Sequence, residues 1–441
     1  MEYTKVKRII TNEKKKLYFK EYESNLDYVN DIEFNKINIY PELLKQKFIG
    51  FGGAVTESVA YSYSLLNEDN KNNLIKDYFS NDGLNYNFIR THINSSDFSL
   101  SSYSYSNERD LSDFSIDHDK NMLIPMIKNI INENKNINIL STPWSPPEFM
   151  KSNNSMLNGG YLKEEYYSLY AEYLVRYINS YNDEGININY LNIQNELGAS
   201  QIWESCLFTY ENEYIFINKY LYPLLKKNNI DINLLCFDHN KDNIYDYAKN
   251  IFKLDKNNII KGIGYHYYTG DHFNNINILS KLYKDKLLIH TEGCCGLSKF
   301  RKRRSIPNAL IYAHDIIGDI NNGCNAYIDW NILLNYKGGP NHTGNYCYSP
   351  VMLTKNNKSY KKNLAYYYIG HISKYIKNAT VIEHSKYTSD LSVLSFINKD
   401  KTITIIILNE SKKTLPYNIV INNKCVSGII NPYQIETLII S

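Results

Sequence analysis

The feature of this sequence that most constrains its fold is a series of eight short apolar runs, each followed by residues with helical spacing. Strands that alternate with helices form parallel pairs, because a parallel return needs a crossover connection. The predicted strands are residues 48–53, 86–93, 137–144, 190–196, 233–239, 259–268, 286–292 and 323–330. Eight such units predict an α/β fold, a closed (β/α)8 TIM barrel.

An open, doubly wound sheet is the alternative arrangement of the same elements. Such a sheet normally carries a Gly-rich phosphate loop after its first strand. The glycines of GFGGA at residues 50–54 do not have the G-x-G-x-x-G spacing. The sequence therefore favours the closed barrel.

Both ends of the chain differ from its middle. Residues 379–441 hold short alternating runs separated by Asn, Asp, Lys and Gly, which is typical of antiparallel strands, and the first 40 residues hold similar runs. We expect both ends to build one β-sandwich. The predicted domains are residues 1–40 and 379–441 for the sandwich and 41–378 for the barrel.

Composition and charge exclude several classes of protein. A net charge of +3 gives no reason to expect nucleic acid or an anionic membrane as partner. The first residues are charged and do not resemble a signal peptide, and the longest apolar run, 402–408, is too short to span a bilayer. We therefore expect a cytoplasmic protein without integral membrane contact, whose seven cysteines are thiols. No Cys-x-x-Cys pair is present, and we expect no metal site and no cofactor.

Polar and aromatic residues follow the predicted strands. In a TIM barrel the C-terminal strand ends carry the reactive side chains. The residues at or shortly after these ends include Arg90, Asp97, Trp144, Asn195, Glu196, Asp238, His239, His266, Tyr268, Glu292 and Trp330. This mixture suits a sugar, since polar groups bond its hydroxyls and aromatic rings stack on its apolar face.

Glu196 and Glu292 each end an apolar run, YLNIQNE at 190–196 and KLLIHTE at 286–292. Two carboxylates that face one cleft are the minimum equipment for cleaving a glycosidic bond. A retaining enzyme holds them roughly 5–5.5 Å apart and an inverting one roughly 6.5–9.5 Å. The alternative interpretation is that one of them is only a salt-bridge partner.

Several longer motifs resemble signatures of glycoside hydrolase family 30, which includes the glucosylceramidases. They are GFGGAVTES at 50–58, RTHINSSDFS at 90–99, TPWSPPEFMK at 142–151, LNIQNE at 191–196, HTEG at 290–293 and DWNILLNYKGGPNHTGNYC at 329–347. The resemblance runs from about residue 45 to 350. It implies a (β/α)8 barrel with an attached β-sandwich built from both chain ends, and a retaining mechanism.

The resemblance also implies roles for individual residues. Glu196 would be the acid/base and Glu292 the nucleophile, which Arg90 would help to keep ionised. We expect the negative charge of Glu292 to raise the pKa of Glu196, so that Glu196 holds a proton near neutral pH. The predicted substrate-binding residues are Arg90, Asp97, Trp144, Asn195, His239, His266, Tyr268, Trp330 and Asn345.

We therefore predict a retaining β-glycoside hydrolase acting on β-glucosides, as a glucosylceramidase or β-glucosidase does. An endo-β-1,6-glucanase or a β-xylosidase is the alternative within the family, and a catalytically silent carbohydrate-binding protein is the alternative outside it. The basic run KFRKRR at 299–304 is either a solvated loop or a contact for an acidic group. We expect the adjacent Cys294 and Cys295 to be packing residues.

Overall fold

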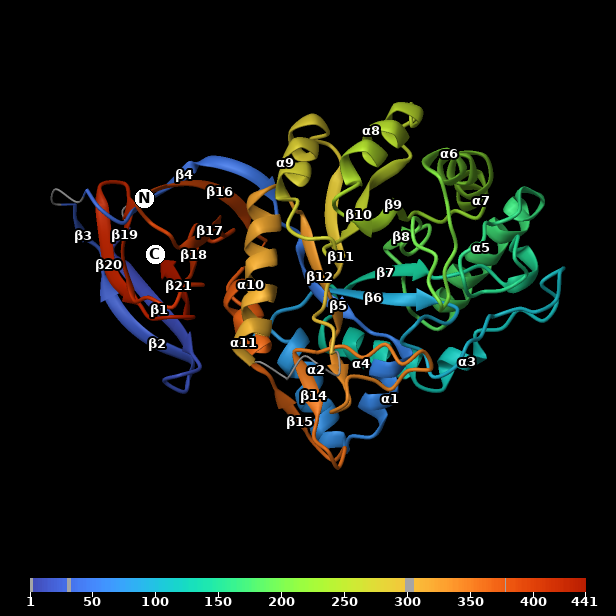
Figure 1. Ribbon diagram of the computed structural model, residues 1–441, viewed down its shortest axis with the longest axis horizontal. Helices are drawn as coiled ribbons and strands as arrows, with labels where there is room; N and C mark the ends of the chain where they lie inside the picture. The colour runs from blue at the N-terminus through green and yellow to red at the C-terminus, as the bar shows by residue number, and fades with distance from the viewer. Residues whose placement is uncertain (1–2, 30–32, 298–304, 377) are drawn as a thin grey trace.

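The computed structural model describes residues 3–29, 33–297, 305–376 and 378–441, and it confirms the predicted barrel with an attached β-sandwich (Figure 1). Eight parallel strands close in the order β10-β11-β12-β5-β6-β7-β8-β9. Their bounds are β5 Gly50–Ala54, β6 Phe88–Ile93, β7 Asn138–Pro143, β8 Tyr190–Asn192, β9 Asn233–Asn240, β10 Ile260–His266, β11 Leu287–Glu292 and β12 Ala326–Asn331. The basic run at 299–304 lies outside the described residues.

Each predicted helical segment contains at least one helix, and some are divided. The helices are α1 Glu57–Ser64, α2 Glu68–Phe79, α3 Asp117–Lys120, α4 Leu123–Glu133, α5 Tyr167–Asp183, α6 Tyr210–Ile215, α7 Tyr222–Lys227, α8 Ile244–Leu254, α9 Phe273–Leu282, α10 Ser305–Asn321 and α11 Leu364–Ser373. A π-helical turn, Phe216–Leu221, joins α6 to α7, and short 3-10 turns span Glu148–Met150 and Glu164–Tyr166. The first segment divides because the Asn67 side chain accepts from the Asn70 backbone N–H and so begins a second helix.

The glycines of the first barrel strand serve packing. Gly52 in β5 pairs with Phe88 in β6. A Cβ on Gly52 would lie 2.4 Å from the Phe88 carbonyl oxygen, so only glycine allows this approach of the two strands. The GFGGA segment is thus an element of barrel closure.

Both chain ends contribute to one ten-stranded sheet, in the order β2-β1-β21-β18-β17-β16-β4-β19-β20-β3. Its strands are β1 Lys5–Asn12, β2 Leu17–Asn25, β3 Asp27–Tyr28, β4 Lys36–Lys47, β16 Thr380–Tyr387, β17 Ser392–Ile397, β18 Ile403–Leu408, β19 Leu415–Ile421, β20 Lys424–Ile430 and β21 Ile435–Ile440. The predicted domain boundary after residue 40 falls within β4, which continues in this sheet to Lys47.

The sandwich packs against α10 and α11 at one end of the molecule (Figure 1). The buried ring of His371 in α11 joins the two parts, because it bonds the hydroxyls of Thr11 in β1 and Thr437 in β21 at 2.8 and 2.9 Å. None of the helices among the described residues is long and apolar enough to cross a membrane.

A small sheet follows the last barrel strand. It consists of β13 Leu333–Leu334, β14 Val351–Leu353 and β15 Tyr360–Lys362. The segment between β13 and β14, residues 335–350, returns to the C-terminal ends of the barrel strands, where Asn345 bonds Asp97. This connection supplies one wall of the cavity described next.

Candidate active site

A cavity of about 590 Å³ lies at the C-terminal ends of the barrel strands and contains both predicted catalytic carboxylates. Six of the nine predicted substrate-binding residues line it: Asp97, Trp144, Asn195, Tyr268, Trp330 and Asn345. Other residues also line the cavity, although the sequence did not predict them as site residues. They include Gln201, Trp203, Asn240, Tyr267, Cys294 and Cys347. Strand ends from around the barrel thus converge on one site.

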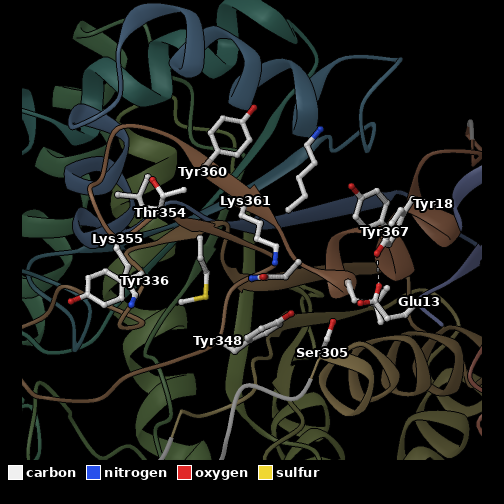
Figure 2. A pocket seen from close by; sticks show the side chains of 15 residues that line it. Glu13, Tyr18, Ser305, Tyr336, Tyr348, Thr354, Lys355, Tyr360, Lys361 and Tyr367 are labelled. Atoms are coloured by element: carbon white, nitrogen blue, oxygen red, sulfur yellow. Dashed lines mark hydrogen bonds between the residues drawn. The ribbon is translucent and has the colours of Figure 1, made fainter. Parts of the chain in front are cut away.

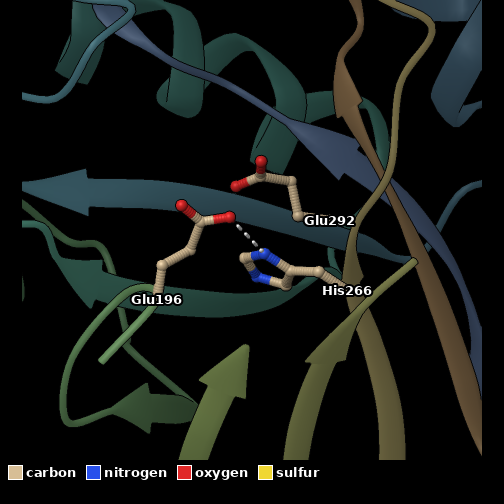
Figure 3. Close-up of side chains that lie close together, drawn as sticks. All are labelled: Glu196, His266 and Glu292. Carbon is tan, nitrogen blue, oxygen red and sulfur yellow. Dashed lines mark hydrogen bonds and ion pairs between the residues drawn. The ribbon is translucent and has the colours of Figure 1, made fainter. Parts of the chain in front are cut away.

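Glu196 and Glu292 point toward each other and toward His266 (Figure 3). One carboxylate oxygen of each glutamate and one ring nitrogen of His266 all lie within 4.8 Å of one another. Glu292 is the last residue of β11, as predicted. The predicted proximity of the two carboxylates is therefore present in the fold.

Glu196 lies on a loop. The strand predicted to run to residue 196 ends at Asn192, which places Glu196 four residues past β8. Its φ is 46°, in the left-handed region that non-glycine residues seldom adopt, and its backbone N–H donates to the Asp238 carbonyl oxygen at 2.8 Å. Such backbone conformations cluster at functional sites, where surrounding contacts hold them in place.

Arg90 in β6 organises the carboxylates from behind the cavity wall. It is fully buried and donates from Nη1 to Glu292 at 2.6 Å and from Nη2 to Asp238 at 2.7 Å. Nη2 also donates to the Asn195 side chain at 2.8 Å. Burial alone would raise the pKa of Asp238, but the charges of Arg90 and His266, with the Thr291 hydrogen bond, together outweigh it and lower that pKa to about 2. Asp238 is thus a permanent anion beneath the site.

Glu292 receives a second hydrogen bond, from the Tyr268 hydroxyl to Oε1 at 2.8 Å. Arg90 holds the other oxygen, Oε2. Both carboxylate oxygens are therefore held by donors on different strands or loops, which fixes the orientation of the carboxylate.

His266 and Glu196 face each other at 3.3 Å, and their pKa values are shifted in opposite directions. Burial alone would lower the pKa of His266, but the negative charges of Glu292 and Asp238, with contacts of the two ring nitrogens to Asp238 and Glu196 at 3.3 Å, raise it to about 9. Burial would likewise raise the pKa of Glu196, but the hydrogen bond and charge of His266 outweigh it and lower that pKa. The prediction of a raised Glu196 pKa is wrong for the free enzyme, because a cation faces Glu196 at 3.3 Å.

Stability should depend on pH through this ring. A folded-state pKa of about 9 exceeds the ordinary His value of about 6.5, so the stabilisation is complete below pH about 6.5 and is lost as pH rises towards about 9. The free energy of unfolding can be measured by urea denaturation at pH about 7.5 and at pH about 9.5. Over this pH change we expect wild type to lose about 2 kcal/mol more of this free energy than His266→Gln loses.

His371→Gln is the matched control, because burial lowers the pKa of that His to about 3 and it stays neutral throughout this range. Its stability should follow the wild-type pH dependence. Parallel pH curves for wild type and His266→Gln would contradict a protonated His266.

Asp97 is a buried carboxyl whose pKa is raised. Burial, followed by the negative charge of Glu292, raises the pKa of Asp97 well above its ordinary value, and the Asn345 amide only partly opposes this. The Asn345 Nδ2 donates to Asp97 Oδ2 at 3.0 Å. A protonated Asp97 has an O–H that can donate to a ligand hydroxyl.

Two indoles form an aromatic wall. Trp144, just after β7, stacks on Trp330 of β12 with ring centroids 5.6 Å apart and planes at 28°. The Arg90 guanidinium lies 4.8 Å from the Trp144 ring centroid and 5.4 Å from that of Trp330. The wall is rigid, because both indoles are almost fully buried.

Three predicted substrate-binding residues do not line the cavity. Arg90 and His266 are fully buried behind it, where they contact carboxylates. His239 of β9 packs beneath the loop that carries Glu196, so closely that a Cβ on Gly198 would lie 2.9 Å from its ring. These side chains position other groups of the site.

Sequence reasoning assigned no role to Asp238 or Gln201. Asp238 was noted near the end of the fifth predicted strand, but only its neighbour His239 was selected as a substrate-binding residue. Asp238 accepts hydrogen bonds from Arg90 and Thr291. Gln201 donates to Glu196 Oε2 at 3.4 Å from a loop with no distinctive motif. A carboxylate at a strand end was a usable signal for Asp238, whereas Gln201 had none.

Two side-chain clusters in the described part of the chain could in principle hold a cation. One consists of Glu196, His266 and Glu292, where the protonated imidazole already supplies a positive charge. The other consists of His290, Asp315 and Asp319, and the Lys241 ammonium lies 2.6 and 2.9 Å from its two carboxylates. In both clusters a protein cation already balances part of the negative charge of the carboxylates.

A second cavity, of about 780 Å³, lies where the barrel meets the sandwich (Figure 2). Glu13 and Tyr18 line it from the β1–β2 hairpin, and Tyr336, Tyr348 and Tyr360 line it from the barrel side. It contains neither glutamate of the predicted pair nor any predicted substrate-binding residue. The chemistry described above therefore belongs to the smaller cavity.

Comparison with known proteins agrees with this geometry. The TIM-barrel domain of glycosyl hydrolase family 30 matches residues 48–376, and the β-sandwich domain of that family matches residues 378–438. The lysosomal acid glucosylceramidase of Mus musculus is 28% identical over 406 residues, covering 87% of this chain and 79% of the mouse protein.

Two solved structures resemble the whole chain. SrfJ from Salmonella typhimurium is 32% identical with a TM-score of 0.96, and the match covers 99% of both chains. The endo-beta1,6-glucanase BT3312 is 26% identical with a TM-score of 0.88, over 98% of both chains.

Proposed function

The chain belongs to glycosyl hydrolase family 30 and is therefore an O-glycosyl hydrolase, and on this premise we propose that it cleaves β-glucosides with retention of configuration. The observation that carries the proposal is the approach of Glu196 and Glu292 oxygens to within 4.8 Å in one cavity. Such a close approach of two carboxylates suits direct attack on the sugar, whereas an inverting pair leaves roughly 6.5–9.5 Å between its carboxyl groups for a water molecule.

In the first step Glu292 attacks the anomeric carbon while the leaving oxygen takes a proton from Glu196. Arg90 and Tyr268 hold the two Glu292 oxygens, so the carboxylate is already oriented for attack. The proton resides on His266 in the free enzyme and reaches the leaving oxygen through Glu196, across the 3.3 Å contact. Attack consumes the negative charge of Glu292, which weakens the hold of His266 on that proton.

In the second step Glu196 accepts a proton from water, and the resulting hydroxide displaces Glu292 from the sugar. Two inversions leave the β configuration unchanged. The sugar meets the Trp144 and Trp330 indoles on its apolar side, while Asp97 and Asn345 bond hydroxyls. Asn195 bonds the 2-hydroxyl, an interaction that strengthens in the transition state.

Glucose is the sugar we propose, since the relatives reported above include a glucosylceramidase and an endo-beta1,6-glucanase. Endo-β-1,6-glucanase is the second candidate, supported by the match to BT3312 over nearly the whole of both chains. Action on β-xylosides is a third possibility within the family. A binding protein without activity would have no need of the oriented Glu292 carboxylate.

A panel of nitrophenyl glycosides tests the substrate. We expect the β-glucoside to be cleaved with a kcat/KM at least about tenfold above that of the β-xyloside, which lacks the hydroxymethyl group. NMR should show β-glucose as the first product.

Internal cleavage of β-1,6-glucan with poor turnover of aryl glucosides would favour the second candidate. Sugar binding by calorimetry without turnover of any β-glycoside would contradict a hydrolase and favour a silent carbohydrate-binding protein.

A further inference from the structure

Two cysteine thiols face each other in the wall of the active-site cavity. The Cys294 S–H donates to Cys347 Sγ, with the two sulfurs 3.2 Å apart. Both side chains are almost buried, and both line the cavity. We propose that Cys294 and Cys347 are a modification site, at which a low-molecular-weight disulfide converts the two thiols into a reversible internal disulfide.

The backbone already holds the two segments side by side. Gly296 and Cys347 form an antiparallel bridge. The Tyr348 N–H donates to the Cys295 carbonyl at 2.7 Å, and the Leu297 N–H donates to the Tyr346 carbonyl at 2.8 Å. The two sulfurs are already 3.2 Å apart, and a disulfide bond needs them at about 2.05 Å.

The hydrogen bond between the sulfurs assigns their order of reaction. The S–H of Cys294 is directed at Cys347 Sγ, so the Cys294 proton is already engaged in a hydrogen bond. The bond to Cys347, followed by burial, raises the pKa of Cys294, so Cys294 stays protonated until the second step. Cys347 is thus the attacking sulfur and Cys294 the resolving one.

The chemistry is two thiol–disulfide exchanges. Cys347 thiolate attacks the small disulfide, forming a mixed disulfide and releasing one small thiolate, which takes a proton from solvent. Cys294 then loses its proton and attacks Cys347 Sγ, releasing the second small thiol. Two protein thiols are oxidised, and one small disulfide is reduced to two thiols.

The cross-link would join two sides of the sugar site. Cys294 Sγ lies 3.6 Å from the Tyr268 hydroxyl that bonds Glu292. Cys347 is two residues from Asn345, which bonds Asp97. Closing the loop between the cysteines restricts the unfolded chain, so the oxidised protein should unfold at a higher temperature.

Peptide mapping tests the site without relying on activity. Folded full-length protein is incubated with hydroxyethyl disulfide, quenched with N-ethylmaleimide, digested and analysed without reduction. We expect one peptide pair joined through Cys294 and Cys347, two hydrogens lighter than the free peptides. The protein should lose two titratable thiols, gain several degrees in unfolding midpoint, and recover both thiols with dithiothreitol.

Single substitutions complete the test. Cys347→Ser should prevent the cross-link and the midpoint shift, and Cys294→Ser should leave only the mixed disulfide on Cys347. Cys425→Ser, a buried cysteine of the sandwich, is the matched control and should cross-link as wild type does. A link from Cys347 to Cys295, or unmodified Cys294 and Cys347 in the folded wild type, would overturn the proposal. The wild-type map decides this even if a variant fails to fold.

Discussion

Glu292→Gln should abolish hydrolysis, lowering kcat/KM by roughly four orders of magnitude or more. The amide cannot attack the anomeric carbon, so the double displacement has no first step. The substitution preserves the shape of the side chain, and Asp238 still accepts a hydrogen bond from Arg90 at 2.7 Å. The variant should therefore fold, which circular dichroism melting can verify, while steady-state assays measure the loss.

Glu213→Gln is the matched control. Burial raises the pKa of Glu213 to about 8, so its carboxyl is mostly neutral at pH 7 and an amide replaces it closely. It lies on α6, where it accepts from the Tyr247 hydroxyl at 2.6 Å, and it does not line the cavity. Glu213→Gln should keep activity within a few-fold of wild type.

Covalent labelling identifies the nucleophile directly. A fluorinated β-glucoside with a good leaving group should trap the glycosyl-enzyme of wild type, and peptide mass spectrometry should locate the sugar on Glu292. A sugar attached to any other residue, or turnover by Glu292→Gln close to that of wild type, would contradict the assignment.

Glu196→Gln should show a loss that depends on the leaving group. Poor leaving groups such as an alkyl alcohol need a proton in the transition state. The rate of hydrolysis of alkyl glucosides should therefore fall by a factor of about 10² to 10⁴. Dinitrophenolate leaves without protonation, so the rate of the first step with dinitrophenyl glucoside should fall far less. The burst of dinitrophenol followed by slow turnover would report the missing base of the second step.

The comparison between substrates is the internal control, because a general disturbance of the site slows both alike. Equal losses for alkyl and dinitrophenyl glucosides would therefore contradict an acid/base role for Glu196. Such a result would not affect the assignment of Glu292 as nucleophile, and His266 would become the candidate acid.

Much of the fold followed from local pattern. Eight apolar runs predicted eight barrel strands, and the position of Glu292 at the end of its run was confirmed to the residue. Alternating runs at both chain ends predicted the sandwich, which is present. The ends of the strands were predicted less well. The run that was predicted to continue to Glu196 ends as a strand at Asn192, and the loop that follows packs on β9.

The sequence by itself determined the architecture and the chemical types at the barrel rim, because apolar periodicity sets which residues face the core and strand ends of a closed barrel share one face. Only the tertiary structure decided which charged groups lie together and how their contacts shift one another's pKa values. Arg90 meets Glu292 across 202 residues of chain and Asp238 across 148, and the negative charges of these two carboxylates raise the pKa of His266. Proton positions and the contact between Cys294 and Cys347 arise from burial and from neighbours distant in sequence, which no local pattern encodes.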